Sequence, residues 1–441
     1  MNKNFKNVLV TGFALFSIFF GAGNLIFPPT LGFISGDKWL WTALGFLLTC
    51  ISLPLLGIVA VAIVGGRTED LTNKIGKSFG TILCSIIMLS IGPLFCIPRT
   101  GATTFELGVQ PLLGNVNPIL VSIIYFTITY IFTMNESSVV DKVGSILTPI
   151  LLIALFTIIF KGIITPLGNP INTGLDKAFS KGFTEGYQTM DALGSIILAQ
   201  MVIGSLISKG YKTRKDQIDI TIKSGIVSAI CLGTVYGGLL YIGSTASGVF
   251  PKDTTRTELL ILITQGLLGD WSKVIFGGAI SIACLTTSVG LTATTANYFS
   301  KLSNGKISYK SIVLAICIFS CFISNYGVET IIKLAVPVLV TAYPVVIVLI
   351  VTNLLCKYIN KKGIYTGSVY GALLVSIFGS LSSIGIKISF VENIINKLPL
   401  AAQGFSWILP AIIGGVIGAL IQSTENRVQG TDSREQNTEC R

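Results

Sequence analysis

The sequence predicts an all-α protein that crosses a membrane about twelve times. Hydrophobic residues make up 51% of the 441 residues and charged residues only 12%, whereas soluble domains have about 25% charged residues. Apolar stretches of about 20 residues, the length that spans a bilayer as a helix, recur along almost the whole chain. We therefore expect one integral membrane domain over residues 1–423 and a polar, disordered tail over 424–441.

The expected spans follow the apolar runs in chain order. Two segments between them have structure of their own: Glu258–Leu268 is apolar but too short to cross, so we expect an external re-entrant helix, and Leu167–Lys181 is expected to be an external loop. The spans cover approximately residues 8–33, 39–65, 79–105, 117–134, 142–161, 183–208, 217–246, 271–300, 309–325, 329–356, 365–386 and 404–423.

The net charge of +11 is spread over short loops between the spans. With the N-terminus inside, one side of the membrane holds about twice as many Lys and Arg residues as the other, in the direction of the positive-inside rule. Both termini are therefore predicted to be cytoplasmic, and no nucleic-acid partner is expected. The chain has no histidine and no Cys-x-x-Cys pair, so zinc and haem sites are not expected.

The first span is interrupted. It reads FALFSIFFGAGNLIFPP over Phe13–Pro29, with a break at Gly21–Asn24 and a double proline that closes it. Gly and Pro weaken or remove helical hydrogen bonds, and in lipid the freed groups must find protein, water or a ligand.

Freed N–H groups at this break would bind a carboxylate, helped by the positive end of the next half-helix. The expected substrate-binding residues are Gly21, Ala22, Gly23 and Asn24, and the expected cation-binding carbonyls are those of Phe19 and Ala22. The alternative is that the small residues only allow close helix packing.

The segment Tyr187–Ser195 of span six is the second signal, and a break is expected there at Gly194–Ser195. Asp191 lies about one-third of the way into an apolar run, where a charge is costly and usually functional. Carbonyls at the Gly194–Ser195 break would receive a substrate ammonium group, while Asp191 stabilises the opened helix or pairs with a cation. The expected substrate-binding residues are Asp191, Ala192, Gly194 and Ser195. The alternative is that Asp191 caps a helix at the external interface.

The two breaks stand about 170 residues apart, each in the first span of a five-span set. Matched broken helices in two halves are typical of inverted-repeat transporters. We expect repeat one at about residues 8–161, repeat two at about 183–356, and two extra helices over about 365–423.

Span eight offers oxygen ligands for a small cation. Thr287 and Ser288, with the carbonyl of Cys284 or Ala283 one turn earlier, form a compact set of hard donors of the kind that suits Na⁺. Hydroxyls are also common packing groups in membrane helices. The expected sodium ligands are thus Phe19, Ala22, Cys284, Thr287 and Ser288.

Four further charged residues lie inside spans three and ten. Arg99 and Glu106 are seven residues apart, two turns along one helical face, and we expect them to snorkel to the interface, with a gate salt bridge as the alternative. Glu329 and Lys333 belong to a proline-containing span that is either a moving gate or a static kink. The sequence assigns no role to these four.

No catalytic set is evident. The chain has no P-loop, no Gly-x-Ser-x-Gly motif and no deep carboxylate pair at helical spacing, so we expect neither an enzyme nor a cofactor. A solute or ion channel is the chief alternative to a carrier, but channels need a continuous polar pore, and the chain shows few aligned polar stripes.

Three segments resemble the branched-chain amino acid:cation symporter family, the BrnQ-type carriers. They are Thr11–Phe16 continuing through Gly21–Pro29, then Thr189–Leu193, and Ala283–Thr287. The resemblance covers essentially the whole chain. It implies Na⁺-coupled uptake of leucine, isoleucine and valine across a bacterial cell membrane, and a LeuT-like 5+5 inverted-repeat fold. The alternative within this class is a proton-coupled carrier of another small neutral amino acid. Membrane lipid is an expected partner, and no obligatory protein partner is expected.

Overall fold

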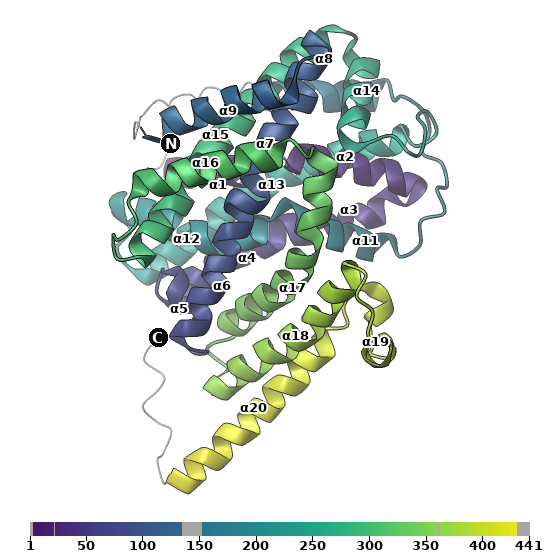
Figure 1. Cartoon of the computed structure of the whole chain (residues 1–441). Helices are drawn as coiled ribbons and strands as arrows, with labels where there is room; N and C mark the ends of the chain where they lie inside the picture. Colours follow the sequence, from purple (N-terminus) through teal and green to yellow (C-terminus); the bar gives the residue numbers. More distant parts are fainter. Residues whose placement is uncertain (1–2, 22, 135–151, 360, 430–441) are drawn as a thin grey trace.

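The computed structural model describes residues 3–21, 23–134, 152–359 and 361–429, and this part of the chain contains helices and loops but no strand (Figure 1). The first half comprises α1 (Lys3–Phe19), α2 (Gly23–Ser35), α3 (Trp39–Leu47), α4 (Leu53–Val64), α5 (Thr68–Thr72), α6 (Lys77–Leu89), α7 (Cys96–Thr103), α8 (Gln110–Leu113), α9 (Pro118–Met134) and the helix Leu152–Ile164. The second half comprises α11 (Ala178–Glu185), α12 (Asp191–Ser208), α13 (Arg214–Thr245), α14 (Arg256–Leu268), α15 (Trp271–Leu302), α16 (Tyr309–Ser324), α17 (Val328–Leu354), α18 (Lys362–Ser383), α19 (Ser389–Asn396) and α20 (Ile408–Gln429).

The helices confirm an integral membrane protein. Seven helical stretches of the described chain are long and apolar enough to cross a bilayer, and five shorter apolar helices accompany them. Their bounds agree with the expected spans to within a few residues at most ends, although the fifth expected span begins outside the described residues. The count of twelve crossings stays a prediction.

Two of the long spans change helix type along their length. A π-helical segment, η2 (Leu48–Ser52), joins α3 to α4, and two more, η3 (Ser90–Leu94) and η4 (Thr104–Val109), flank α7. A π-helical turn rotates every later side chain relative to a regular helix. The seven-residue spacing between Arg99 and Glu106 therefore does not place these two residues on one face.

Backbone contacts at glycine join the second half of span one and the first half of span six to partner helices. The α-carbon of Gly32 in α2 lies against the carbonyl of Leu240 in α13, so that a Cβ there would come within 1.9 Å of the carbonyl oxygen. In the same way Gly182 in α11 lies against the carbonyl of Thr42 in α3. Span one thus packs on span seven, and span six on span two, which is the relation that two inverted five-span repeats would produce.

The expected external loop before span six is tied to the end of span one. Thr173 donates a hydrogen bond of 2.6 Å to the carbonyl of Ile34, and the N–H of Asp37 donates one of 3.0 Å to the carbonyl of Ile171. The expected re-entrant segment forms α14, which packs against α2 and α15.

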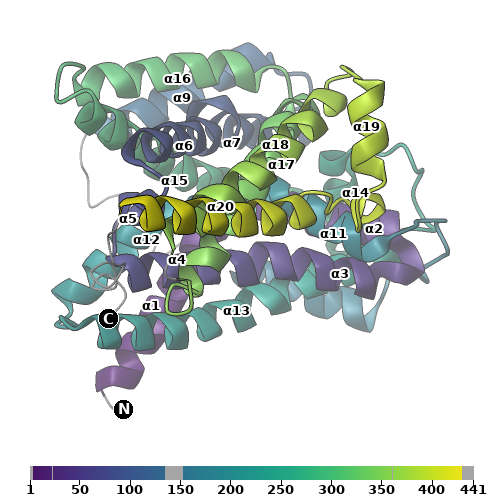
Figure 2. The same ribbon diagram turned by 90° about the horizontal axis from the view of Figure 1, so that it is seen from below.

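The last helices form a separate pair. α18 and α20 lie side by side in both views, with α17 next to α18 (Figures 1 and 2). Glycines allow the two backbones to touch, as at Gly367, whose Cβ position is 2.0 Å from the carbonyl oxygen of Gly414. Figure 2 shows α9 and α16 together at one edge and α1 and α13 at the opposite edge.

Candidate functional site

The first span breaks where the sequence predicts. α1 ends at Phe19 and α2 begins at Gly23, with Phe20 and Gly21 non-helical between them, while Ala22 lies outside the described residues. The prediction that the double proline closes the span is wrong, because Pro28 and Pro29 lie inside α2. Proline has no N–H to donate, so the two rings remove the helical donors that would reach the carbonyls of Asn24 and Leu25.

Two of the N–H groups at this break have partners inside it. The N–H of Gly21 donates to the carbonyl of Phe19 at 3.1 Å, and the N–H of Asn24 donates to the carbonyl of Gly21 at the same distance. A ligand carboxylate that used these N–H groups would therefore have to replace short-range backbone bonds. Gly23 itself is buried.

The second break lies a few residues before its predicted position. A 3₁₀ turn, η5 (Gly186–Thr189), ends at Met190, which adopts left-handed dihedral angles with φ 61°, and α12 starts at Asp191. Left-handed geometry is uncommon for a residue other than glycine and is typical of functional sites. Gly194 and Ser195 do not interrupt the helix, because they lie within α12.

Asp191 is consequently the first residue of a helix that starts inside the protein. Its side chain is 7% exposed, and a carboxylate at a helix N-terminus is stabilised by the helix dipole. The amide Nδ2 of Asn24 donates a hydrogen bond of 2.7 Å to the Asp191 Oδ2 atom, and it donates a second to the hydroxyl of Tyr236 in α13. The two broken helices therefore meet through a direct side-chain bond.

Arg99 lies beside the same two breaks. It is 2% exposed, its Nη1 donates a hydrogen bond of 2.8 Å to the carbonyl of Gln188 in η5, and its Nη2 approaches the α-carbon of Gly23 so closely that a Cβ there would be 2.8 Å away. The prediction that Arg99 snorkels is wrong, since the helical turns of α7 direct it inward. No other charged side chain in the described ranges is as buried as Arg99 and Asp191.

Other polar groups on neighbouring spans complete the surroundings of Asp191. The thiol of Cys50 in η2 lies 3.4 Å from the hydroxyl of Thr189, and Thr189 donates to the carbonyl of Gly186 at 2.9 Å. Sequence reasoning missed Tyr236 and Cys50 as neighbours of Asp191. A tyrosine in the middle of an apolar span was the available signal for Tyr236, because its hydroxyl needs a buried partner.

Two of the predicted substrate-binding residues are turned toward other partners. The hydroxyl of Ser195 donates to the carbonyl of Ala192 at 2.8 Å and faces Gly57 in α4. The N–H of Gly194 donates to the carbonyl of Met190 at 2.9 Å as part of the first turn of α12. The structure therefore brings together Gly21, Gly23, Asn24 and Asp191, but it directs the Ser195 side chain away from them.

The hydroxyls of span eight point in two directions. Thr287 is the side chain nearest to Gly21 from α15, with its Cγ2 3.9 Å from the Cβ position of that glycine. The hydroxyls of Thr286 and Thr287 both donate to the carbonyl of Ala283, at 2.9 and 3.0 Å. Ser288 faces span four instead, 3.4 Å from the hydroxyl of Thr129. Cys284, four residues earlier on the same face, is buried.

Glu106 of span three and Glu329 of span ten each bond a residue of α14. Glu106 accepts hydrogen bonds from the hydroxyl of Thr257 (2.7 Å) and the N–H of Val328 (2.9 Å), so it does not pair with Arg99. Arg256 forms an ion pair of 2.5 Å with Glu329 and a longer one of 3.7 Å with Glu185. Lys333 is exposed.

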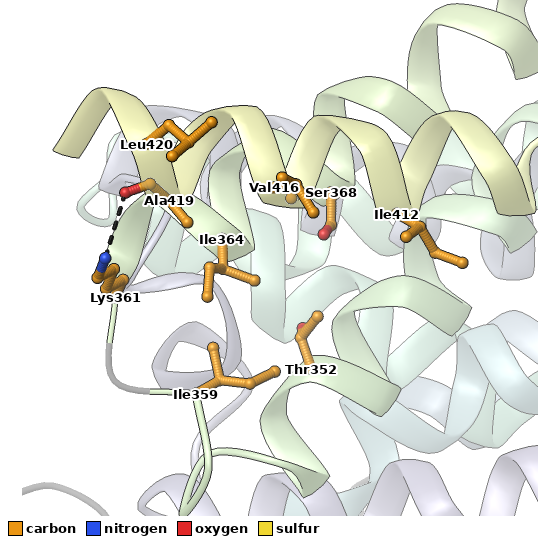
Figure 3. A pocket seen from close by; sticks show the side chains of 10 residues that line it. Thr352, Ile359, Lys361, Ile364, Ser368, Ile412, Val416, Ala419 and Leu420 are labelled. Atoms are coloured by element: carbon orange, nitrogen blue, oxygen red, sulfur yellow. Dashed lines mark hydrogen bonds between the residues drawn. The ribbon is translucent and has the colours of Figure 1, made fainter. Parts of the chain in front are cut away.

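A cavity of about 340 Å³ is lined by residues near the C-terminal end of the chain, between Thr352 and Leu420. It is formed by the end of α17 together with α18 and α20, as Figure 3 shows, and Lys361 at its rim donates to the carbonyl of Ala419. Its lining is mostly aliphatic, with Ile364, Ile412 and Val416 facing the space (Figure 3). It holds none of the predicted site residues.

Comparison with known proteins identifies the relatives of this chain. The family model described as branched-chain amino acid transport protein matches residues 4–425. The branched-chain amino acid permease BraB of Bacillus subtilis is 39% identical, over 94% of this chain and 95% of that protein. The branched-chain amino acid transport system 2 carrier protein of Pseudomonas aeruginosa is 34% identical over 94% and 95%. These relatives are permeases and carriers, so the chain is a transporter rather than an enzyme.

Solved structures show the fold. The inward-facing conformation of Mhp1 covers 95% of this chain and 91% of its own, with a TM-score of 0.63 at 12% identity. MhsT in complex with L-phenylalanine covers 94% and 98%, with a TM-score of 0.54 at 14% identity. Both are LeuT-like transporters. The chain belongs to the branched-chain amino acid transport protein family and has the LeuT-like fold.

Proposed function

We propose that this protein is a sodium-coupled symporter that imports leucine, isoleucine and valine by alternating access. The observation that carries the proposal is the 2.7 Å hydrogen bond between Asn24 and Asp191, because it joins the two broken helices at one buried point. Family membership supports the substrate class. Sodium coupling, a location in the bacterial cell membrane and cytoplasmic termini are parts of the proposal.

A zwitterionic amino acid needs a partner for each of its charges. The Asp191 carboxylate is buried at the start of α12, and its bonded partner there is a neutral amide. A substrate ammonium group that displaced Asn24 from Oδ2 would exchange a neutral donor for a charged one, and charge-assisted hydrogen bonds are roughly twice as strong. Asp191 is therefore the proposed amine site.

The region around Asn24 also supplies apolar surface for an aliphatic side chain. The ring of Tyr236 stacks on Phe20 with centroids 6.2 Å apart and meets Phe46 edge-on at 5.7 Å. One methylene in an apolar pocket is worth only about 1–3 kcal/mol. Discrimination among leucine, isoleucine and valine should accordingly be modest.

The proposed sodium site lies between the first break and α15. Thr287 is next to Gly21; in the sequence Phe19 stands two residues before that glycine and Ala22 directly follows it. The shared bonding of Thr286 and Thr287 to the Ala283 carbonyl favours these three residues over Cys284 and Ser288 as the contribution of span eight. Sodium bound there would hold the break of span one in place while the substrate binds.

A proton-coupled carrier is the second candidate. It is favoured by the burial of Asp191, because a carboxyl that is alternately exposed to the two sides of a membrane can carry a proton. With no histidine in the chain, such a relay would depend on carboxylates.

Uptake of labelled leucine into proteoliposomes separates these possibilities. Gradients of Na⁺, H⁺ and Li⁺ are imposed one at a time, with the membrane potential clamped. The proposal expects accumulation with the sodium gradient alone. Accumulation driven only by the proton gradient would identify the proton as the coupling ion. Absence of saturable leucine uptake under every gradient would contradict the proposed function.

A further inference from the structure

Arg99 is a buried cation that lies near Asp191 but forms no direct ion pair with any residue that the structure describes. It takes part in none of the ion pairs within 4.0 Å that the described residues form. Its Nη1 bonds a neutral carbonyl, its Nη2 has a long contact of 3.7 Å with the thiol of Cys96, and its buried Nε has no hydrogen-bond partner. A buried guanidinium in this state is costly, since burial of a charge requires pairing and full hydrogen bonding.

The guanidinium is held at the junction of the two breaks. Gln188 anchors it to the segment before α12, and the ring of Phe27 in α2 lies 5.4 Å from its central carbon. Gly23 leaves the room that it occupies, because any Cβ at that position would be 2.8 Å from Nη2. The glycine thus keeps the guanidinium in contact with the start of α2.

Arg99 and Asp191 therefore place opposite charges next to adjacent residues of one short segment. Arg99 touches Gly23, and Asp191 bonds the next residue, Asn24, yet the two charges do not pair with each other within 4.0 Å. A free amino acid carries a carboxylate and an ammonium group separated by one carbon atom. An amino acid lying across this segment would satisfy both buried charges at once.

We infer that Arg99 binds the α-carboxylate of the substrate. This inference rests on the proposed function and adds to it a side-chain anchor on span three, beyond the backbone groups of Gly21–Asn24. Nε and Nη2 lie on one edge of a guanidinium, and this edge matches the two oxygens of a carboxylate. Gly23 then has a second role, which is to leave space for that edge.

Binding of leucine and leucinol to the purified full-length protein tests this assignment. Leucinol keeps the ammonium group and the side chain of leucine but has a hydroxymethyl group in place of the carboxylate. The ratio of the two dissociation constants is measured for the wild type, for Arg99→Gln, for Arg99→Lys and for the control Arg67→Gln, whose residue is exposed. The wild type and the control should prefer leucine strongly.

Arg99→Gln should lower the preference for leucine over leucinol by about tenfold to a hundredfold, because a charge-assisted pair is lost for leucine only. Arg99→Lys should keep part of it. Gly23→Ala should also reduce the ratio by displacing the guanidinium, and this variant decides the matter if Arg99→Gln does not fold. If the ratio of the two dissociation constants is unchanged in the folded variants, even with weaker binding of both ligands, Arg99 only balances the charge of Asp191. Absence of leucine binding to the wild type would instead contradict the proposed function.

Discussion

The side-chain amide of Asn24 donates a hydrogen bond of 2.7 Å to the carboxylate of Asp191, although 167 residues separate them in the chain. Each residue lies in the first turn of the half-helix that follows a break. The bond therefore joins the two helical interruptions directly. This connection is the centre of the proposed transport site.

Tyr236→Phe should raise the Michaelis constant for leucine about three- to tenfold. The substitution removes one of the two acceptors of the Asn24 amide, and a hydrogen bond of this kind is worth about 0.5–1.5 kcal/mol. Uptake kinetics in proteoliposomes measure the effect. Tyr241→Phe is the matched control, because Tyr241 is on the same helix but packs against Trp39. Equal effects of the two changes would argue against a role for the Tyr236 hydroxyl.

Thr287→Ala should raise the sodium concentration needed for half-maximal uptake by at least about tenfold, as expected for the loss of an oxygen ligand and about 1.4 kcal/mol. Ser288→Ala should leave it unchanged, because the Ser288 hydroxyl faces Thr129. The sodium dependence of leucine uptake is measured for both variants at fixed leucine. A larger effect of Ser288→Ala would instead support Cys284, Thr287 and Ser288 as the sodium ligands of span eight.

Arg256→Gln should destabilise the protein by about 1–3 kcal/mol, the range for a lost charged hydrogen bond in a partly buried site. Arg256 is 19% exposed and bonds Glu329 at 2.5 Å, so the change leaves that carboxylate without its cation. Lys223→Gln breaks the exposed Lys223–Asp219 pair and should cost less than about 1 kcal/mol. Melting temperatures in detergent compare the two. Similar values would mean that the ion pairs of Arg256 do not stabilise the packing of these helices.

Gly32→Ala should prevent α2 and α13 from packing as observed. A Cβ at Gly32 would lie 1.9 Å from the carbonyl oxygen of Leu240, and backbone atoms cannot yield as a side chain can. Gly237→Ala is the control in α13, since nothing lies within 4 Å of its Cβ position. The control should be neutral or slightly stabilising, because alanine favours a helix by about 1 kcal/mol over glycine. Folded yield and melting temperature report the difference.

The sequence allowed most of the architecture to be predicted, because spanning helices need long apolar runs whose ends are marked by charge. The first break was predictable for the same kind of reason: glycine and asparagine in the middle of an apolar run have few structural roles. The position of the double proline was not, since proline can lie within a helix when other groups satisfy the freed carbonyls.

The second break was predicted in the right span but at the wrong residues. Glycine at position 194 suggested an interruption, yet helices accommodate single glycines, and the left-handed residue is Met190. No local property of methionine favours that conformation, so the surrounding tertiary structure determines it. The turn η5 directly before Met190 packs against η2, α2 and α17, and these contacts are formed by residues far away in the sequence.

The relative direction of Arg99 and Glu106 was also beyond local reasoning. The seven-residue spacing to Glu106 assumed a regular α-helix, and the π-helical segment η4 changes that phase. Likewise, Thr287 and Ser288 were treated as one set of ligands, although the Ser288 hydroxyl faces Thr129 and Thr287 faces the first break. Only the packing of α15 between the first break and α9 shows which of the two faces Gly21.

The comparison of leucine with 4-methylpentanoate tests the central claim most directly. The two molecules share the side chain and the carboxylate, but only leucine has the ammonium group that Asp191 is proposed to bind. Dissociation constants are measured for the wild type, for Asp191→Asn and for the exposed control Asp219→Asn. The wild type and the control should bind leucine far more tightly, and Asp191→Asn should reduce this preference by about tenfold or more. A preference that is the same in all three proteins would contradict the assignment of Asp191 and, with it, the meeting of the two breaks as the amine site.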